Sequence, residues 1–201
     1  MFSRNVPGMT EILHRATVGI AGCGGLGSNA AMLLVRAGIG GLVLVDFDRV
    51  EISNLNRQFF FQQDIGKPKV AALAEHLRAI NPAVKLTLHE VRLSRETVAW
   101  TFAGCDILIE AFDRAEAKEW LIEAWCAAYP DRPIVCASGL AGYGRSAAMQ
   151  VRRTGTIVIV GDGVSDMGEG LCAARVMLAA ALEANEAIAL LMERKQKGGI
   201  S

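Results

Sequence analysis

Residues Thr17–Gly27 read TVGIAGCGGLG, an apolar run followed by a Gly-x-Gly-x-x-Gly turn. The apolar run predicts a buried strand over residues 17–21, and a helix is expected over about 28–37. Glycines at this spacing permit a tight turn, and the N-terminus of the following helix offers free N–H groups to a phosphate. The stretch therefore predicts a nucleotide site, and a plain strand-to-helix turn is the alternative. The expected binding residues are Gly22, Gly24, Gly25 and Gly27.

Strands and helices alternate along the rest of the chain. Apolar runs predict strands at residues 41–46, 84–88, 105–110, 133–137, 145–151 and 156–161. Helices are expected at residues 66–80, 94–102 with Ser94 as N-cap, 115–128 and 171–194. The last two strands flank Arg152–Gly155 as a hairpin, residues 162–170 are expected to form a flexible acidic loop, and 195–201 a frayed tail. This pattern predicts an α/β fold: a Rossmann-like, mostly parallel sheet with helices on both faces and an antiparallel hairpin at its C-terminal edge.

Length and composition exclude several classes of protein. The chain has 201 residues, 21 basic and 21 acidic, so it has no net positive charge for a polyanion, and nucleic-acid binding is not expected. Hydrophobic residues make up 52% of the chain, which excludes a disordered protein. We expect one domain over residues 1–201.

Cysteine usage and hydropathy indicate a compartment. The five cysteines form no C-x-x-C pair, which argues against a zinc knuckle or a disulfide framework. The first seven residues contain no apolar core typical of a secretory signal. The longest apolar stretch, residues 176–192, is interrupted by Glu183, Asn185 and Glu186, so no membrane span is expected. A cytoplasmic protein fits these features best.

The segment after the second strand suggests the type of reaction. Asp46 ends that strand, where an acidic residue commonly binds ribose hydroxyls. Arg57 and Lys69 follow, and each alone would be read as a solvated surface charge. Together, after a phosphate loop, they favour nucleotidyl transfer over a nicotinamide dehydrogenase, because charge on the α-phosphate and the leaving pyrophosphate must be neutralised.

Five stretches carry a family resemblance that runs from about residue 2 to 192. They are GCGGLGS (22–28), DFDRVEISNLNRQ (46–58), GKPK (66–69), ILIEAFD (107–113) and ASGLAGYG (137–144). With them the chain resembles the ubiquitin-activating-enzyme-like adenylyltransferases, the ThiF/MoeB/HesA family, and within it a short ThiF type. The string Ser-Asn-Leu-Asn-Arg-Gln at residues 53–58 is the most specific of these features.

The resemblance implies a role for each matching residue. The glycine loop would hold the ATP phosphates and Asp46 the ribose, while Asn54, Arg57 and Gln58 would contact the nucleotide. Lys69 would reach the phosphates from the first turn of its helix. The resemblance also implies that Asp113 binds Mg²⁺, although Asp113 could instead cap the helix that starts near residue 115. Arg4 resembles an arginine that the family supplies across a dimer interface, although a residue so near a terminus could be disordered.

Three positions depart from the family. The usual Asp-Asn of the magnesium site is Asp113-Arg114 here, so Arg114 either contacts phosphate or points away. Relatives with structural zinc have two C-x-x-C pairs, and since this chain has neither, no zinc is expected. Relatives with a reactive thiol place it in a loop of the C-terminal part, where only Cys172 is available; its alternative is a small buried residue. Cys23 is interpreted as a tolerated small residue, and the other three cysteines as core.

The resemblance implies an activity and partners. It implies adenylylation, with ATP and Mg²⁺, of the C-terminal glycine carboxylate of a small β-grasp, ThiS-like sulfur carrier in thiamine biosynthesis. A separate sulfur donor would then form the thiocarboxylate, and the enzyme would be a homodimer. The alternatives are activation of a MoaD-like carrier, a tRNA-modifying dehydratase on the same scaffold, a nicotinamide oxidoreductase and a non-catalytic adapter that binds carriers.

Overall fold

The computed structural model describes residues 1–198, except for the side chains of Met167 and residues 195–198. Within this range, seven strands form one sheet in the order β3-β2-β1-β4-β5-β7-β6. The strands are β1 (Thr17–Ala21), β2 (Gly41–Val45), β3 (Lys85–His89), β4 (Ile107–Glu110), β5 (Ile134–Ala137), β6 (Gln150–Thr154) and β7 (Ile157–Gly161). Neighbouring strands are parallel except β6 and β7 at the edge, so the predicted α/β class and its antiparallel C-terminal hairpin are confirmed.

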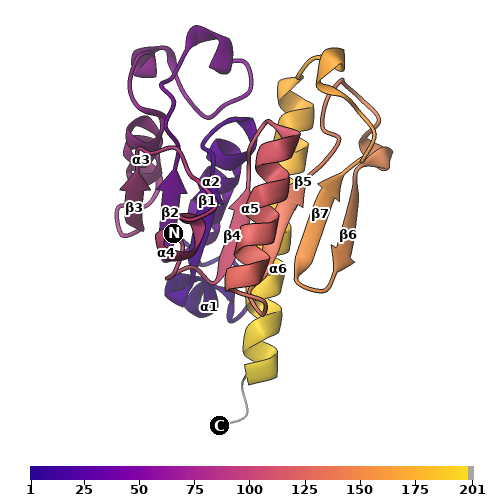
Figure 1. Cartoon of the computed structure of the whole chain (residues 1–201). Helices are drawn as coiled ribbons and strands as arrows, with labels where there is room; N and C mark the ends of the chain where they lie inside the picture. Colours follow the sequence, from indigo (N-terminus) through magenta and orange to yellow (C-terminus); the bar gives the residue numbers. More distant parts are fainter. Residues whose placement is uncertain (199–201) are drawn as a thin grey trace.

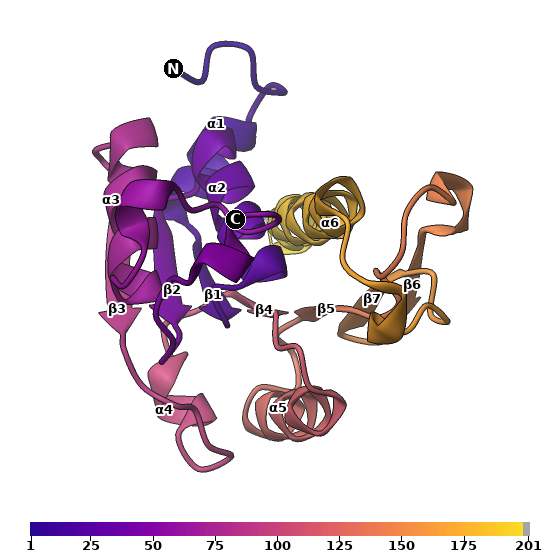
Figure 2. The same cartoon turned by 90° about the horizontal axis from the view of Figure 1, so that it is seen from above.

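Helices cover both faces of the sheet (Figure 2). They are α1 (Met9–Arg15), α2 (Gly25–Ala37), α3 (Lys69–Ile80), α4 (Val98–Thr101), α5 (Ala115–Ala128) and α6 (Ala173–Gly198). α2, α3 and α6 lie on one face, while α4 and α5 lie on the other. Successive side chains of a strand point to opposite faces of the sheet, so the buried strands contribute to a hydrophobic core on each face. In β4, Ile107 and Ile109 belong to one core and Leu108 to the other. The sheet is therefore buried between two helical layers, as its continuous apolar strands require.

The strand order creates an opening beside β1. The chain runs from β1 to β2 and β3 on one side and then crosses to β4 on the other side, so the connections after β1 and β4 diverge. In open α/β sheets this switch point is where ligands bind, at the carboxyl ends of the strands. Figure 1 shows these ends at the top, with the connections that follow β2, β5 and β7 gathered around them.

The glycine-rich turn is tighter than expected, because α2 begins at Gly25 rather than Ser28. Gly22 has a φ of +97°, a conformation that glycine adopts without strain. A Cβ on Gly27 would overlap the carbonyl oxygen of Gly22, so the first turn of the helix folds directly against the loop. The last glycines of the motif therefore belong to the helix.

Other boundaries differ where local hydrogen bonds compete with regular structure. The helix expected over 94–102 contracts to α4, because the Thr97 hydroxyl both accepts from the Ser94 N–H and donates to the Ser94 carbonyl, each at 3.0 Å. Ser94 is thus part of a closed turn rather than an N-cap. The strand expected from Cys105 begins at Ile107, after Asp106 has accepted a hydrogen bond from the Thr17 N–H at 2.9 Å.

The C-terminal third also needs correction. The hairpin turn falls at residues 155–156, so Arg152–Thr154 are strand, and residues 146–148 form a short 3-10 helix instead of strand. The loop over 162–170 contains a 3-10 helix at Met167–Glu169. Residues 195–198, expected as a frayed tail, continue α6, while 199–201 lie outside the described residues. No helix of the described chain combines the length and apolarity needed to cross a membrane.

Candidate functional site

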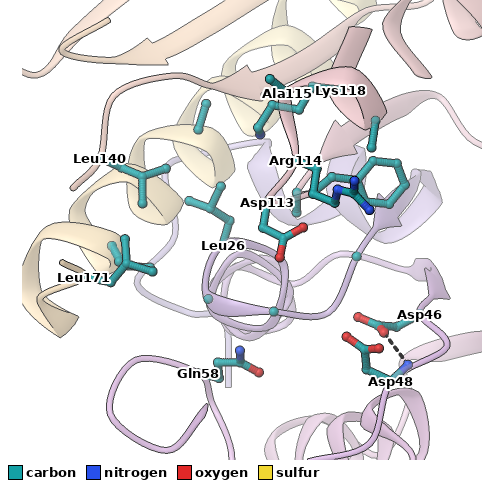
Figure 3. A pocket seen from close by; sticks show the side chains of 18 of the residues that line it. Leu26, Asp46, Asp48, Gln58, Asp113, Arg114, Ala115, Lys118, Leu140 and Leu171 are labelled. Carbon is teal, nitrogen blue, oxygen red and sulfur yellow. Dashed lines mark hydrogen bonds between the residues drawn. The ribbon is translucent and has the colours of Figure 1, made fainter. Parts of the chain in front are cut away.

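A cleft of about 920 Å³ opens at the carboxyl ends of the strands and collects most of the expected site residues. Figure 3 shows Asp46, Asp48 and Gln58 on one side of it and Asp113 and Arg114 on another. The expected residues that line it are Gly22, Gly24, Gly25, Asp46, Arg57, Gln58, Lys69 and Asp113. Gly27 lies in the helix behind the loop, and Asn54, Arg4 and Cys172 are not among the lining residues of the described chain.

Asp46 fastens the phosphate loop to the end of β2. Its carboxylate accepts the Cys23 N–H at 2.7 Å and the Asp48 N–H at 2.8 Å. Burial raises the pKa of Asp46, while these N–H groups and the Lys69 ammonium oppose the rise. Each carboxylate oxygen has a second lone pair. Asp46 can therefore hold the loop and still accept a hydroxyl donor from a ligand in the cleft.

Lys69 lies in the first turn of its helix, as expected, although α3 begins at Lys69 rather than at Gly66 because the backbone of Pro68 is not helical. Its ammonium enters the cleft beside an acidic partner. The Nζ atom lies 3.0 Å from Oδ2 of Asp48, and the Lys69 side chain is only 8% exposed. Asp48, which the sequence analysis did not single out, is half-exposed. The carboxylate of Asp48 holds the Lys69 ammonium in the cleft, where an anionic ligand can compete for it.

Arg57 lies across the phosphate loop. Its stem packs over Gly25, where an added Cβ would lie 3.5 Å from Cγ of Arg57. One terminal nitrogen of the guanidinium donates to the Ser53 carbonyl at 3.1 Å and to the Asn56 side chain at 2.8 Å. A guanidinium has five N–H donors, so others remain available to phosphate oxygens. The buried Gln58 also lines the cleft, and its Oε1 accepts no hydrogen bond within the described residues.

Two polar residues of α2 hold the backbone of Arg57–Phe59 in place, and neither was singled out from the sequence. Asn29 donates from Nδ2 to the carbonyls of Gly25, at 2.7 Å, and Arg57, at 2.9 Å. The Ser28 hydroxyl accepts the Phe59 N–H at 2.9 Å. Both residues are fully buried polar side chains in a mostly apolar helix, directly after the glycine loop. That position was the available signal, because buried polar groups need partners.

Asp113 lines the cleft on a different side from Asp46 and Gln58 (Figure 3). It is exposed, it makes no hydrogen bond or ion pair within the described residues, and α5 has no side-chain cap, so the helix-capping alternative is wrong. Mg²⁺ in nucleotide sites is held by one or two carboxylates together with phosphate oxygens, and this free carboxylate fits that pattern. Arg114 also lines the cleft.

A buried ion pair supports the turn that carries Asp113. Glu110 is fully buried at the end of β4, where it accepts the Phe112 N–H at 2.7 Å and lies 2.9 Å from the Lys118 ammonium. Burial raises the pKa of Glu110, and Lys118 opposes the rise. The pair joins β4 to α5, and Lys118 itself lines the cleft. A Glu inside an apolar strand was the signal for this missed residue.

A further feature that the sequence did not reveal lies beside Asp46. The guanidinium carbon of Arg92 lies 3.9 Å from the centroid of the Phe47 ring, and both residues line the cleft with Val91. A cation over an aromatic face is a stable arrangement. This end of the cleft therefore offers a flat surface next to the carboxylate of Asp46.

Two expected residues lie apart from the cleft. The Asn54 side chain accepts the Glu51 N–H at 3.0 Å and so completes the cap of a short 3-10 helix at Ile52–Asn54. Arg4 is exposed near Asn5, whose side chain donates to the Ala37 carbonyl at the C-terminal end of α2. The 13 residues of α2 put this end about 20 Å from the phosphate loop. Arg4 does not reach the cleft of its own chain.

Cys105 and Cys136 are buried in the core as expected, but Cys126 is only partly buried against it, and the alternative that Cys172 is a buried residue is wrong. Cys172 is exposed directly before α6, next to the cleft-lining Leu171. Burial and the nearby Asp46 raise the pKa of the Cys23 thiol well above its usual value, and burial raises that of Cys105 to about 12.

No group of three His, Cys, Asp or Glu side chains with the spacing of a metal site occurs among the described residues. The absence of zinc stays a prediction.

The fold and the cleft together define an α/β protein with a glycine-rich loop at the switch point of its sheet. The chain belongs to the ThiF family, whose model matches residues 4–198. It is 39% identical over 104 residues to the sulfur carrier protein adenylyltransferase of Thermus thermophilus and 38% identical over 126 residues to the sulfur carrier protein ThiS adenylyltransferase of Escherichia coli. These alignments cover 51% and 62% of this chain but only 38% and 49% of the two relatives.

Solved structures agree with the fold. The tRNA N6-threonylcarbamoyladenosine dehydratase TcdA of E. coli superposes with a TM-score of 0.86, covering 94% of this chain and 91% of that one at 24% identity. The same protein in complex with ATP gives a TM-score of 0.85. At this identity the likeness shows the shared fold.

Proposed function

We propose that this protein transfers the AMP moiety of ATP to the C-terminal glycine carboxylate of a small β-grasp sulfur carrier of the ThiS type. The observation that carries the proposal is the convergence of Arg57, Lys69 and Asp113, from three separate segments, on one cleft beside the glycine loop. Two cations and one free carboxylate around a phosphate loop suit nucleotidyl transfer. A nicotinamide oxidoreductase would leave all three charges unexplained.

In this reaction a carboxylate oxygen of the carrier attacks the α-phosphorus, the bond to the bridging oxygen breaks, and pyrophosphate leaves. The attacking carboxylate is already ionised at neutral pH, so no general base is required. The chain contributes position and charge: the loop N–H groups hold the phosphates, and Lys69 and Arg57 neutralise the charge that develops on phosphorus and on the leaving group. Asp46 binds the ribose hydroxyls, and the surface of Phe47 and Arg92 faces the base.

Asp113 would hold Mg²⁺, which neutralises phosphate charge when bound. The remaining expected roles are part of the same proposal. Arg4 lies too far from its own cleft and would act in the cleft of a second copy, which requires a homodimer. Gln58 would accept a hydrogen bond from the nucleotide with its free Oε1, and Asn54 would support Arg57 through the cap of its 3-10 helix.

The names of the curated relatives support a sulfur carrier as the second substrate, and the ThiS name supports a place in thiamine biosynthesis with a separate sulfur donor. Cys172 is exposed beside the cleft wall, where it could meet an activated carrier. A tRNA-modifying dehydratase is the second candidate, because TcdA shares the fold over nearly the whole chain. The balanced charge of this chain favours the carrier.

The test is exchange of labelled pyrophosphate into ATP by the purified chain, with purified ThiS-type and MoaD-type carriers and a tRNA pool as separate second substrates. The proposal predicts exchange that requires a carrier ending in a free glycine carboxylate. A carrier whose C-terminal carboxylate is amidated is the matched control and should support none. AMP formation that depends on tRNA alone would establish the second candidate instead.

A further inference from the structure

A buried guanidinium at the start of α6 ties three loops together beside the cleft. Arg175 is 3% exposed. Its Nε donates to the Ala141 carbonyl and one terminal nitrogen to the Gly144 carbonyl, both at 2.7 Å. Its other terminal nitrogen pairs with the carboxylate of Asp162, which is also buried. One side chain thus joins the loop after β5, the loop after β7 and the first turn of α6.

Asp162 also forms hydrogen bonds within its own loop. Its Oδ1 accepts the N–H groups of Val164, at 2.9 Å, and Ser165, at 2.8 Å. The Ser165 hydroxyl in turn accepts the Ala141 N–H at 3.1 Å, so the two loops are bonded to each other as well. Burial alone would raise the pKa of Asp162, but these donors and Arg175 lower it to about 2, so the carboxylate is ionised at neutral pH.

The three joined segments form one wall of the cleft, although neither Arg175 nor Asp162 lines it. The lining residues from these segments include Ser138, Leu140, Ala141, Ser165, Leu171 and Val176. Figure 3 shows Leu140 and Leu171 together on the side away from Asp46. Arg175 therefore acts on the cleft only through the loops that it holds.

The order of the strands indicates which ligand this wall serves. Asp46 follows β2, the phosphate loop follows β1, Asp113 follows β4, and the wall follows β5 and β7. Four strand spacings of about 4.8 Å separate β2 from β7, or about 19 Å. Under the proposed function, a nucleotide with its ribose at Asp46 and its phosphates at the loop occupies the β2–β4 half. The β5–β7 half is left for the carboxylate substrate.

We propose that Arg175, with Asp162, is a positioning residue that holds the wall against which the carboxylate substrate is aligned. The inference rests on the proposed function for the identity of that substrate. Arg175 uses a different nitrogen atom for each of the two carbonyls and for the carboxylate, whereas the donors of a lysine all radiate from one nitrogen atom and cannot span the same three positions. Arg175→Lys therefore keeps the charge beside Asp162 and releases the loop carbonyls. Asp162→Asn keeps the shape of the side chain and removes the ion pair.

Hydrogen exchange tests the fastening without any need for activity. Amides of residues 138–149 and 162–172 should exchange about tenfold faster in Arg175→Lys than in the wild type, whereas those of residues 17–27 should not change. Arg194→Lys is the matched control, because Arg194 is an exposed arginine on the same helix that donates to the Asp106 carbonyl. If Arg175→Lys fails to fold, Asp162→Asn provides the same comparison. Unchanged exchange in both loops would overturn the proposal.

Kinetics then separate positioning from general damage. In pyrophosphate exchange with a purified ThiS-type carrier, Arg175→Lys should lower kcat/KM for the carrier by about tenfold to a hundredfold. The Kd for ATP, measured by titration without carrier, should stay within about twofold, because the nucleotide half is untouched. An equal loss in ATP affinity would overturn the positioning role. If the wild type binds ATP but gives no exchange with any carrier, the proposed function fails, and the hydrogen-exchange result alone decides whether Arg175 fastens the wall.

Discussion

Replacing Lys69 with methionine tests the most buried charge of the cleft. Methionine keeps the unbranched stem and the helix propensity, so the change removes mainly the ammonium. The partner Asp48 is half-exposed and can be solvated, so the free energy of unfolding should fall by no more than about 1 kcal/mol. A charged donor aimed at a developing anion in a site from which water is excluded contributes about 2.7–4 kcal/mol to the transition state. Turnover should therefore drop by about a hundredfold to a thousandfold.

The assay is steady-state pyrophosphate exchange at varied ATP, combined with a direct titration of ATP binding. The Kd for ATP should change far less than kcat, since the charge that Lys69 neutralises develops during transfer. Lys67→Met is the matched control, because Lys67 lies two residues earlier, pairs with Glu75 at 2.7 Å and does not line the cleft. Near wild-type turnover in a folded Lys69→Met variant would refute the role assigned to this lysine.

Arg57→Ala should show the same separation of kcat from ATP affinity, and equal losses in both would mean that Arg57 only binds nucleotide. Asp113→Ala should abolish exchange without lowering the melting temperature, because Asp113 is exposed and unpaired among the described residues, and Glu119→Ala on the exposed side of α5 should have no effect. Glu183 is fully buried with both carboxylate oxygens unpaired in the described structure, and burial raises its pKa well above the usual value. A raised pKa in the folded state means that stability falls as pH increases above about 4.3. Glu183→Gln should therefore melt higher than the wild type at pH 8 and show a smaller difference at pH 5; equal shifts at both values would contradict the buried acid. Elemental analysis after chelator washing should find no zinc, and a stoichiometric amount would disprove that expectation.

The sequence predicted the sheet and most of the cleft because both depend on local signals. Apolar runs and glycine turns mark the parallel strands, and parallel strands bring their carboxyl ends to one edge. Arg57, Lys69 and Asp113 lie in segments that follow the loop or these ends, so their convergence could be foreseen. Asn54 illustrates the limit. The motif suggested a contact with the nucleotide, and only the structure shows that its side-chain oxygen accepts the Glu51 N–H and caps a short 3-10 helix.

Long-range polar contacts could not be predicted, because no local pattern reports them. Arg175 is read from the sequence as one charge at the start of an Ala-rich helix, yet its partners lie 13 to 34 residues earlier in the chain. The turn at Ser94–Thr97 was missed although its hydrogen bonds join residues only three apart in the chain. A threonine hydroxyl that bonds to both backbone groups of a nearby residue competes with the helix, and propensity does not resolve that competition.

Activation of a carboxylate with ATP is the activity proposed for this cleft. The most direct measurement is exchange of labelled pyrophosphate into ATP by the wild-type chain, with and without a purified ThiS-type carrier that ends in a free glycine carboxylate. We expect exchange that depends on the carrier, is lost when the C-terminal carboxylate is amidated, and falls at least about a hundredfold in Lys69→Met. Tight ATP binding without exchange for any carrier, or exchange that the amidated carrier supports equally well, would contradict it.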